Sequence, residues 1–164
     1  MKNLLGLTVL ISLIAWGCKS DNCTPEKFTY RWTDVKTIDV VKDTASNHEL
    51  YNMVDGNDLV FSYVRTGEVC EDVLDGDWSE VIRFRADKDA SEFEYVDSNM
   101  AKAKCNFLYS SFSAHGIPQK VNKGTIKGRK LNSSEWEISL SIVTTPQAAE
   151  DTSRTFKFFQ NFIQ

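Results

Sequence analysis

Alternation of apolar and polar side chains with a period of two constrains this fold more than any other sequence feature. It is clearest between residues 136 and 143, where the apolar positions are Trp136, Ile138, Leu140 and Ile142. Successive side chains of a β-strand point to opposite faces of a sheet, so this segment has one face for a core and one for solvent. The pattern predicts an antiparallel strand with one solvated face.

The same alternation recurs along the chain between short turn segments. The candidate strands are 28–32, 35–41, 59–63, 82–86, 93–95, 107–111, 124–131, 136–143 and 156–162. Polar segments at 87–91 and 132–134 have the composition of tight turns. Helical patterns are limited to residues 44–54 and to residues 98–104, where Ser98 is a candidate N-cap. We therefore predict an all-β domain, an antiparallel meander of about eight strands.

The segment in which Ile82 and Phe84 precede a turn, and Phe93 and Tyr95 follow it, resembles small bacterial lipocalin-like domains. The resemblance implies an up-and-down barrel, an architecture without exposed sheet edges. A β-sandwich is the alternative, because alternation alone does not distinguish a closed sheet from two packed sheets. A barrel of this size holds one small apolar ligand or is filled by its own side chains.

The first residues have the composition of an export signal. Lys2 supplies a positive charge, and residues 4–14 are apolar but fewer than the roughly 20 that a membrane-spanning helix needs. Residues 15–17 then lead into Cys18. This stretch resembles the lipobox of bacterial lipoproteins, in which the cysteine carries a diacylglycerol and the chain is cut before it. The resemblance implies that residues 1–17 are a removed signal peptide and that Cys18 is the lipid attachment site.

The resemblance to lipoproteins also implies an organisation and a location. Residues 18–27 would be a lipidated tether, and residues 28–164 a single β domain. The protein would lie in the cell envelope, anchored to the outer membrane and facing the periplasm or the cell surface. Residues 19–22 are either a degenerate form of the signal that sends lipoproteins to the surface or a solvated tether.

Three cysteines remain after Cys18, in a compartment that permits disulfides. They allow three single pairings, each leaving one thiol over. We predict a Cys70–Cys105 disulfide, because both residues lie within the body of the domain. The alternative is that Cys23 ties the N-terminal segment to the domain. No Cys-x-x-Cys motif is present, which argues against a redox site or a zinc knuckle.

Charge and motifs argue against several classes of function. The formal net charge of −4 does not suit nucleic-acid binding, which needs clustered Lys and Arg. The two histidines, His48 and His115, have no partner at metal-ligand spacing. No Gly-x-Ser-x-Gly elbow or phosphate-binding glycine loop occurs. We therefore expect no enzyme activity, no cofactor and no metal site.

The segment from Asp72 to Glu80 contains the residues that are most suggestive of recognition. Asp75 and Asp77 do not follow the Asp-x-Asp-x-Asp-Gly spacing of a calcium loop, and Asp-Gly is common in tight turns. Trp78 follows them at a strand start, where we expect partial exposure. We predict Trp78, Asp75 and Asp77 as candidate contacts with a ligand or partner.

These observations lead to two hypotheses about function. The first is a non-catalytic envelope lipoprotein that binds a small hydrophobic ligand, a glycan or a protein through the open end or a face of its β domain. The alternative is an inhibitor or immunity-type lipoprotein that blocks a partner protein, with the acidic segment facing a basic target. In both, the membrane is a partner through the N-terminal lipid.

Overall fold

The computed structural model describes residues 23–70, 77–111, 114–149 and 151–164. Its strands are β1 (Cys23–Thr24), β2 (Lys27–Lys42), β3 (Glu49–Asp55), β4 (Asp58–Thr66), β5 (Val69–Cys70), β6 (Trp78–Ala86), β7 (Glu92–Val96), β8 (Asn106–Ser111), β9 (Ala114–His115), β10 (Gln119–Lys130), β11 (Glu135–Thr145) and β12 (Thr155–Ile163). Two short helical segments, η1 (Asp97–Asn99) and α2 (Met100–Ala103), connect β7 to β8.

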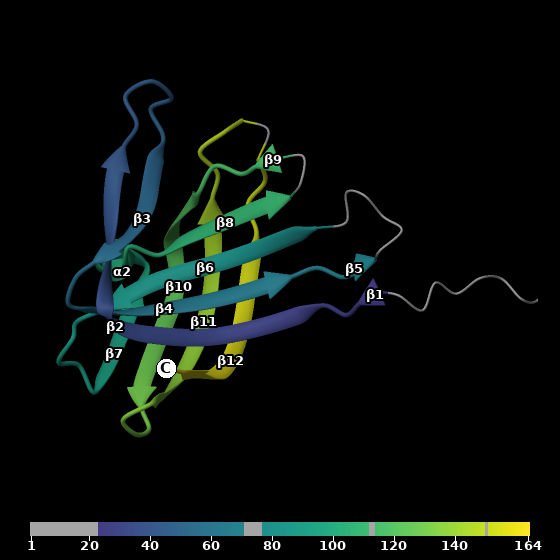
Figure 1. The fold of residues 1–164 in the computed structure, drawn as a ribbon. Coiled ribbons are helices and arrows are strands. Elements are labelled where there is room, and N and C mark those ends of the chain that lie inside the picture. Colours follow the sequence, from purple (N-terminus) through teal and green to yellow (C-terminus); the bar gives the residue numbers. More distant parts are fainter. Residues whose placement is uncertain (1–22, 71–76, 112–113, 150) are drawn as a thin grey trace, which may run out of the picture.

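Seven strands close into a barrel in the order β2, β4, β6, β8, β10, β11 and β12 (Figure 1). Each strand runs antiparallel to the one before it, and β12 returns to β2 through a pairing of Ile163 with Arg31. Because the direction reverses at each of six steps, the first and seventh strands run the same way, and the closing pair is parallel. The predicted all-β barrel is confirmed. The sheet closes on itself, which distinguishes it from the alternative, a β-sandwich. The fold departs from an antiparallel meander in its parallel closing pair and in β7, which follows β6 along the chain but pairs with β10.

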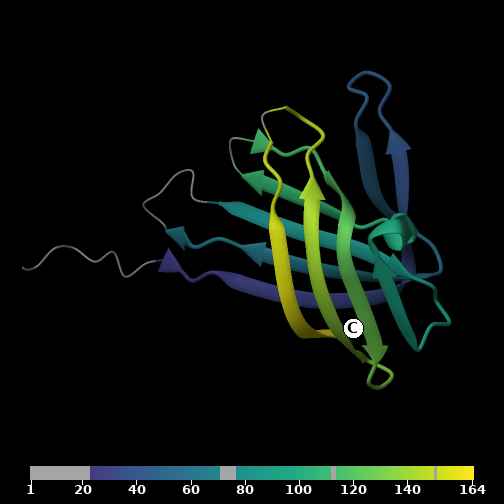
Figure 2. The same ribbon diagram turned by 180° about the vertical axis from the view of Figure 1, so that it is seen from behind.

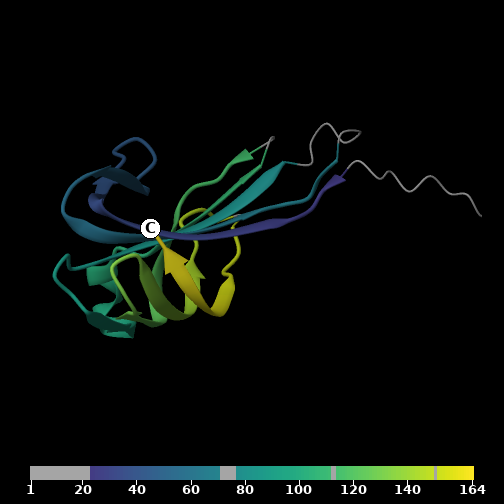
Figure 3. The same ribbon diagram turned by 60° about the horizontal axis from the view of Figure 1, so that its bottom comes forward.

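The barrel has two layers whose strands cross steeply, with β2, β4, β6 and β8 in one layer and β10, β11 and β12 in the other (Figures 1 and 2). Strand β7 extends the second layer beside β10, and β3 pairs with the far half of β2 as a projecting hairpin. At the opposite end the first layer reaches past β12 toward β1 and β5 (Figure 3). We call this end the rim.

Aromatic rings from the two layers meet inside the barrel. The ring of Phe61 on β4 lies 5.4 Å from Trp136 on β11 and 5.9 Å from Phe162 on β12, centroid to centroid. Phe107 on β8 lies 4.9 Å from Phe156 on β12. Such offset and edge-on contacts stabilise packing beyond the area that they bury. The side chains at the predicted inward positions of the alternating strands therefore fill the interior of the barrel.

Burial inside the barrel changes the acidity of Tyr63, which is 6% exposed and packs beside Tyr30 and Phe158. Desolvation raises the pKa of Tyr63 to about 12. The raised pKa means that the folded protein favours the neutral phenol of Tyr63. The contribution of this phenol to stability is complete below the ordinary tyrosine pKa of about 10, and it is lost as the pH rises through about 12. Phenolate absorbance in the Tyr63→Phe variant should match wild type up to pH 10 and fall below it only near pH 12. A difference already present at pH 10 contradicts this expectation.

The disulfide joins Cys23 to Cys70, and Cys105 is a buried free thiol, so the predicted Cys70–Cys105 pairing is wrong. Cys23 and Cys70 lie directly opposite each other in the β1–β5 pair, with Cα atoms 4.0 Å apart. Cys105 lies just before the first residue of β8, Asn106, which pairs with Arg83. The last residues of β8 are at the rim, which is the opposite end of this strand. The length of β8 separates the two ends by about 17 Å, beyond the roughly 7 Å that a disulfide allows between Cα atoms.

The two predicted helical segments have different outcomes. Residues 98–104 contain α2, as predicted, whereas the helix predicted at 44–54 is wrong, because Glu49–Asp55 is strand β3. Asp43 accepts hydrogen bonds from the Ala45 N–H and the Ser46 hydroxyl, and this local turn reverses the chain onto the free edge of β2. Neither helical segment of the described chain is long or apolar enough to cross a membrane.

The two strands predicted at 28–32 and 35–41 form one long strand, β2, with an irregular register between Thr33 and Lys36. The first half pairs with β4 in the barrel and the second half with β3 in the hairpin. Within the predicted tether, Cys23–Thr24 pairs with β5 and Lys27 begins β2. Cys23, the first described residue, is therefore already paired with β5.

Candidate functional site

The first candidate site is a groove of about 580 Å³ at the rim, where Trp78 begins β6. Trp78 is partly buried and the neighbouring Asp77 is exposed. The other lining residues are Thr66, Val69, Ser79, Ser110 and Ser111. The groove thus unites two of the three contact residues predicted from the sequence. The third, Asp75, lies outside the described residues, as does Cys18.

Close packing fixes the indole of Trp78. A Cβ atom added to Gly67 would lie 2.1 Å from Trp78 Nε1, so only glycine permits this approach of the ring to the backbone. The Gly67 N–H donates to the Trp78 carbonyl at 2.9 Å, and the Tyr109 ring stacks at 6.3 Å from the indole. Trp78 is therefore a rigid part of the rim.

Two arginines lie over aromatic rings beside this groove. The Arg65 guanidinium carbon is 5.0 Å from the Trp78 ring and 5.7 Å from Phe28. The corresponding carbon of Arg154 is 4.9 Å from Tyr109 and 5.3 Å from the Phe107 ring. Cation–π contacts of this kind contribute about 0.5–1 kcal/mol at exposed sites and more when desolvated. We call this set the rim ladder: Phe28, Arg65, Trp78, Tyr109, Arg154 and Phe107.

A buried carboxylate joins the two arginines. Glu80 is 5% exposed; Arg65 Nη1 donates to one of its oxygens at 3.1 Å and Arg154 Nη1 to the other at 2.5 Å. Arg65 also donates from Nε to Glu26 at 2.5 Å. The hydrogen bonds to Glu26, and secondarily to Glu80, raise the pKa of Arg65. Because both guanidiniums are already paired with carboxylates, the rim ladder is a structural ion-pair network.

The cysteines in the described part of the chain are held in inert states. One cluster has metal-ligand spacing, namely Cys23, Glu68 and Cys70, but both of its sulfurs are in the disulfide bond. A cysteine must be a thiolate to bind a metal ion. Burial raises the pKa of the Cys105 thiol far above its usual value, which keeps this sulfur protonated and unreactive.

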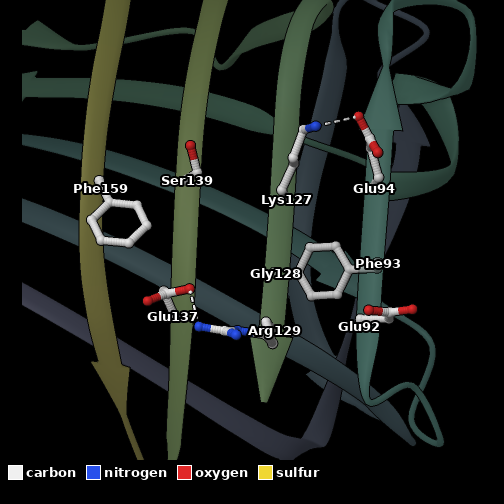
Figure 4. A pocket seen from close by; sticks show the side chains of 9 residues that line it. All are labelled: Glu92, Phe93, Glu94, Lys127, Gly128, Arg129, Glu137, Ser139 and Phe159. Atoms are coloured by element: carbon white, nitrogen blue, oxygen red, sulfur yellow. Dashed lines mark hydrogen bonds and ion pairs between the residues drawn. The ribbon is translucent and has the colours of Figure 1, made fainter. Parts of the chain in front are cut away.

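The second candidate site is a groove of about 600 Å³ on the outer face of β7, β10, β11 and β12, which we call the outer groove (Figure 4). Its most prominent residue is Phe159 on β12, whose side chain is 62% exposed. Phe159 lies directly opposite Ser139 on β11. Phe159 lies at one side of the groove, and the small serine beside it leaves the aromatic ring uncovered (Figure 4).

Charged pairs line the groove between the exposed ring and β7. Lys127 Nζ lies 2.8 Å from Glu94, and Arg129 Nη2 donates to Glu137 at 2.9 Å (Figure 4). Exposed pairs such as these contribute roughly 0–1 kcal/mol to stability. An exposed aromatic residue beside polar and charged side chains is a composition found in protein–protein contact surfaces.

The wall formed by β7 is anchored in the barrel core. A Cβ atom on Gly128 would lie 2.2 Å from Phe93 Cζ, so the glycine lets the Phe93 ring cross the inner side of β10. The ring ends 5.7 Å from Trp136. The outer groove is therefore built on a rigid support, which favours a defined binding surface.

The outer groove was not predicted from the sequence. The signal that would have found it is the adjacent pair Phe158 and Phe159 within an alternating strand. With a period of two, only one ring of such a pair faces the core. Phe158 lies 5.2 Å from Tyr63 inside the barrel, and Phe159 is directed outward.

We compared the chain with known protein families, curated proteins and solved structures. The chain matches no family model, no curated protein and no solved structure.

Proposed function

We propose that this chain is a non-catalytic envelope lipoprotein, held at a membrane by a lipid on Cys18, that recognises a partner protein through the outer groove. The observation that carries the proposal is Phe159, an aromatic residue that is 62% exposed at one side of a rigid groove. Aromatic residues, phenylalanine included, are enriched at protein interfaces. An inhibitor or immunity-type lipoprotein would use the same surface to block its target.

Two further observations support protein recognition over transport of a small hydrophobic ligand. The barrel interior is occupied by rings such as Phe61, Trp136 and Phe162, which contact one another across the two layers. The outer groove, in contrast, is open and bordered by the paired charges of Lys127 and Arg129. A protein surface matches such a shallow area better than a small molecule does, since small ligands prefer enclosed pockets.

The proposal predicts that Phe159→Ser removes binding without unfolding the barrel. Burying a phenylalanine ring contributes roughly 1.5–3 kcal/mol, so we expect partner affinity to fall about 10- to 100-fold. A photo-reactive amino acid in place of Ser139, in cells, should give a discrete adduct with one partner. Phe159→Ser should reduce the yield of that adduct about tenfold.

Val35→Ser is the matched control, because Val35 is 61% exposed but lies on β2. It should leave the adduct unchanged. Both variants should unfold at the urea concentration of wild type, since an exposed side chain contributes little to stability. An adduct that persists in Phe159→Ser, or one that Val35→Ser abolishes equally, contradicts recognition through the outer groove.

A further inference from the structure

The disulfide fastens the start of the folded chain to the rim. Cys23 on β1 is bonded to Cys70 on β5, and the two short strands lie together beyond the ends of β2 and β4 (Figures 1 and 3). The described chain therefore begins at this one end of the barrel. Any anchor that precedes Cys23 acts on the rim first.

The chain between the proposed lipid and the disulfide is short. Cys18 and Cys23 are five residues apart in the sequence. A fully extended chain spans at most roughly 3.6 Å per residue, so this segment reaches about 18 Å whatever path it takes. Without the disulfide the first fixed point would be Lys27 in β2, nine residues from Cys18 and about 32 Å away when extended.

Exposed apolar side chains gather at the same end. Phe28, at the start of β2, is 49% exposed, and Val69 on β5 is 39% exposed. Val69 also lines the rim groove together with the partly buried Trp78. Aromatic side chains are enriched where a protein meets the headgroup region of a bilayer. The rim thus offers an apolar contact on the side to which the anchor leads.

We infer that the rim lies on the lipid bilayer, with Phe28 and Val69 in the headgroup region and the Cys23–Cys70 disulfide holding the barrel in this orientation. The inference rests on the proposed lipid at Cys18. The surface that contacts the rim is the bilayer itself, because the five-residue connection between Cys18 and Cys23 is too short for the rim to turn freely away from the membrane. The outer groove, on the opposite layer of the barrel, then remains open to a partner protein.

Charge decides which lipid the test should use. The exposed described residues at the rim include Glu68 and Asp77 as acids and Lys27 as a base. Anionic headgroups repel a surface with an excess of acids. Contact through Phe28 and Val69 is therefore best measured on vesicles of phosphatidylcholine.

The test uses the full lipoprotein, purified from membranes with its lipid and reconstituted into phosphatidylcholine vesicles. Trp32 and Trp136 are buried, so Trp78→Phe gives a background without a partly exposed tryptophan among the described residues. Phe28→Trp in that background reports on the rim. Phe159→Trp is the matched control, because Phe159 is also an exposed phenylalanine but lies on the outer face of β12.

Lipids brominated high in their acyl chains quench tryptophan on contact. They should lower the Phe28→Trp emission roughly twofold, because tryptophan settles at headgroup level, and leave the Phe159→Trp emission unchanged. Equal quenching of both reporters, or none at Phe28→Trp, overturns the orientation.

A second comparison isolates the disulfide. Cys23→Ser with Cys70→Ser should reduce the Phe28→Trp quenching to the level of the Phe159→Trp control, because the tether lengthens by four residues. Undiminished quenching in a folded disulfide-free variant overturns the role of the disulfide. The reporter pair with the disulfide intact tests the orientation even if that variant does not fold.

The intact mass of the purified protein separates this inference from the proposed function. A mass without a lipid on Cys18 overturns the anchor and the orientation together. A lipidated protein whose rim reporter is not quenched overturns the orientation and leaves the anchor standing.

Discussion

Replacing Cys23 and Cys70 together by serine should lower the free energy of unfolding by about 4 kcal/mol. The disulfide closes a segment of 47 residues that includes β2, β3 and β4. In the unfolded chain this cross-link removes conformational entropy, and the effect grows with the logarithm of the loop length. Urea denaturation of the oxidised wild type and of the double variant measures the difference directly.

Reduction provides the internal control. A reductant should bring the wild type down to the stability of the double variant and should leave the double variant unchanged, because the remaining described cysteine, Cys105, is buried and unpaired. Equal stability of oxidised and reduced wild type contradicts the Cys23–Cys70 bond as a stabilising link.

Replacing Glu80 by glutamine should destabilise the barrel by roughly 3 kcal/mol. The carboxylate is 5% exposed and accepts hydrogen bonds from Arg65 and Arg154. Its loss leaves two guanidiniums close together without the charge between them. Removing one member of a buried ion pair costs about 3–5 kcal/mol, and the lower value applies because both arginine side chains are about one-third exposed to screening water.

The same substitution at an exposed pair is the control. Glu94→Gln removes the partner of Lys127, but both side chains are more than half exposed, so the loss should be below about 1 kcal/mol. Thermal or urea unfolding of the two variants tests the difference. Similar losses at Glu80 and Glu94 would show that the rim network is no more than a surface pair.

Strand positions could be predicted because each strand has two unlike environments. In β11 the sequence alternates from Trp136 to Ile142, and the structure buries those apolar positions while their neighbours face solvent. Alternation did not predict a strand where both faces of that strand are exposed to solvent. In β3, Leu50, Met53 and Val54 are all about 40% exposed, so no alternation marks the strand, and their spacing imitates a helical stripe.

Contacts between distant segments could not be predicted from local pattern. The disulfide depends on which strand ends meet at the rim, and Cys23 was assigned to the tether because nothing nearby in the sequence indicates its β5 partner. The rim ladder likewise depends on register: Arg65 is paired opposite Glu80, and Trp78 opposite Ser111. Trp78 could be anticipated from its place at a strand start, whereas Arg154 could not.

The parallel pairing of β12 with β2 has a consequence for how the protein is made. Its closing contact joins residues 31 and 163, so no earlier part of the chain can substitute for the last strand. Until β12 is in place, the folding chain presents β2 and β11 as bare sheet edges, which are sites of aggregation. Closure of the barrel by β12 removes both edges in one step, so any delay in pairing this strand prolongs their exposure.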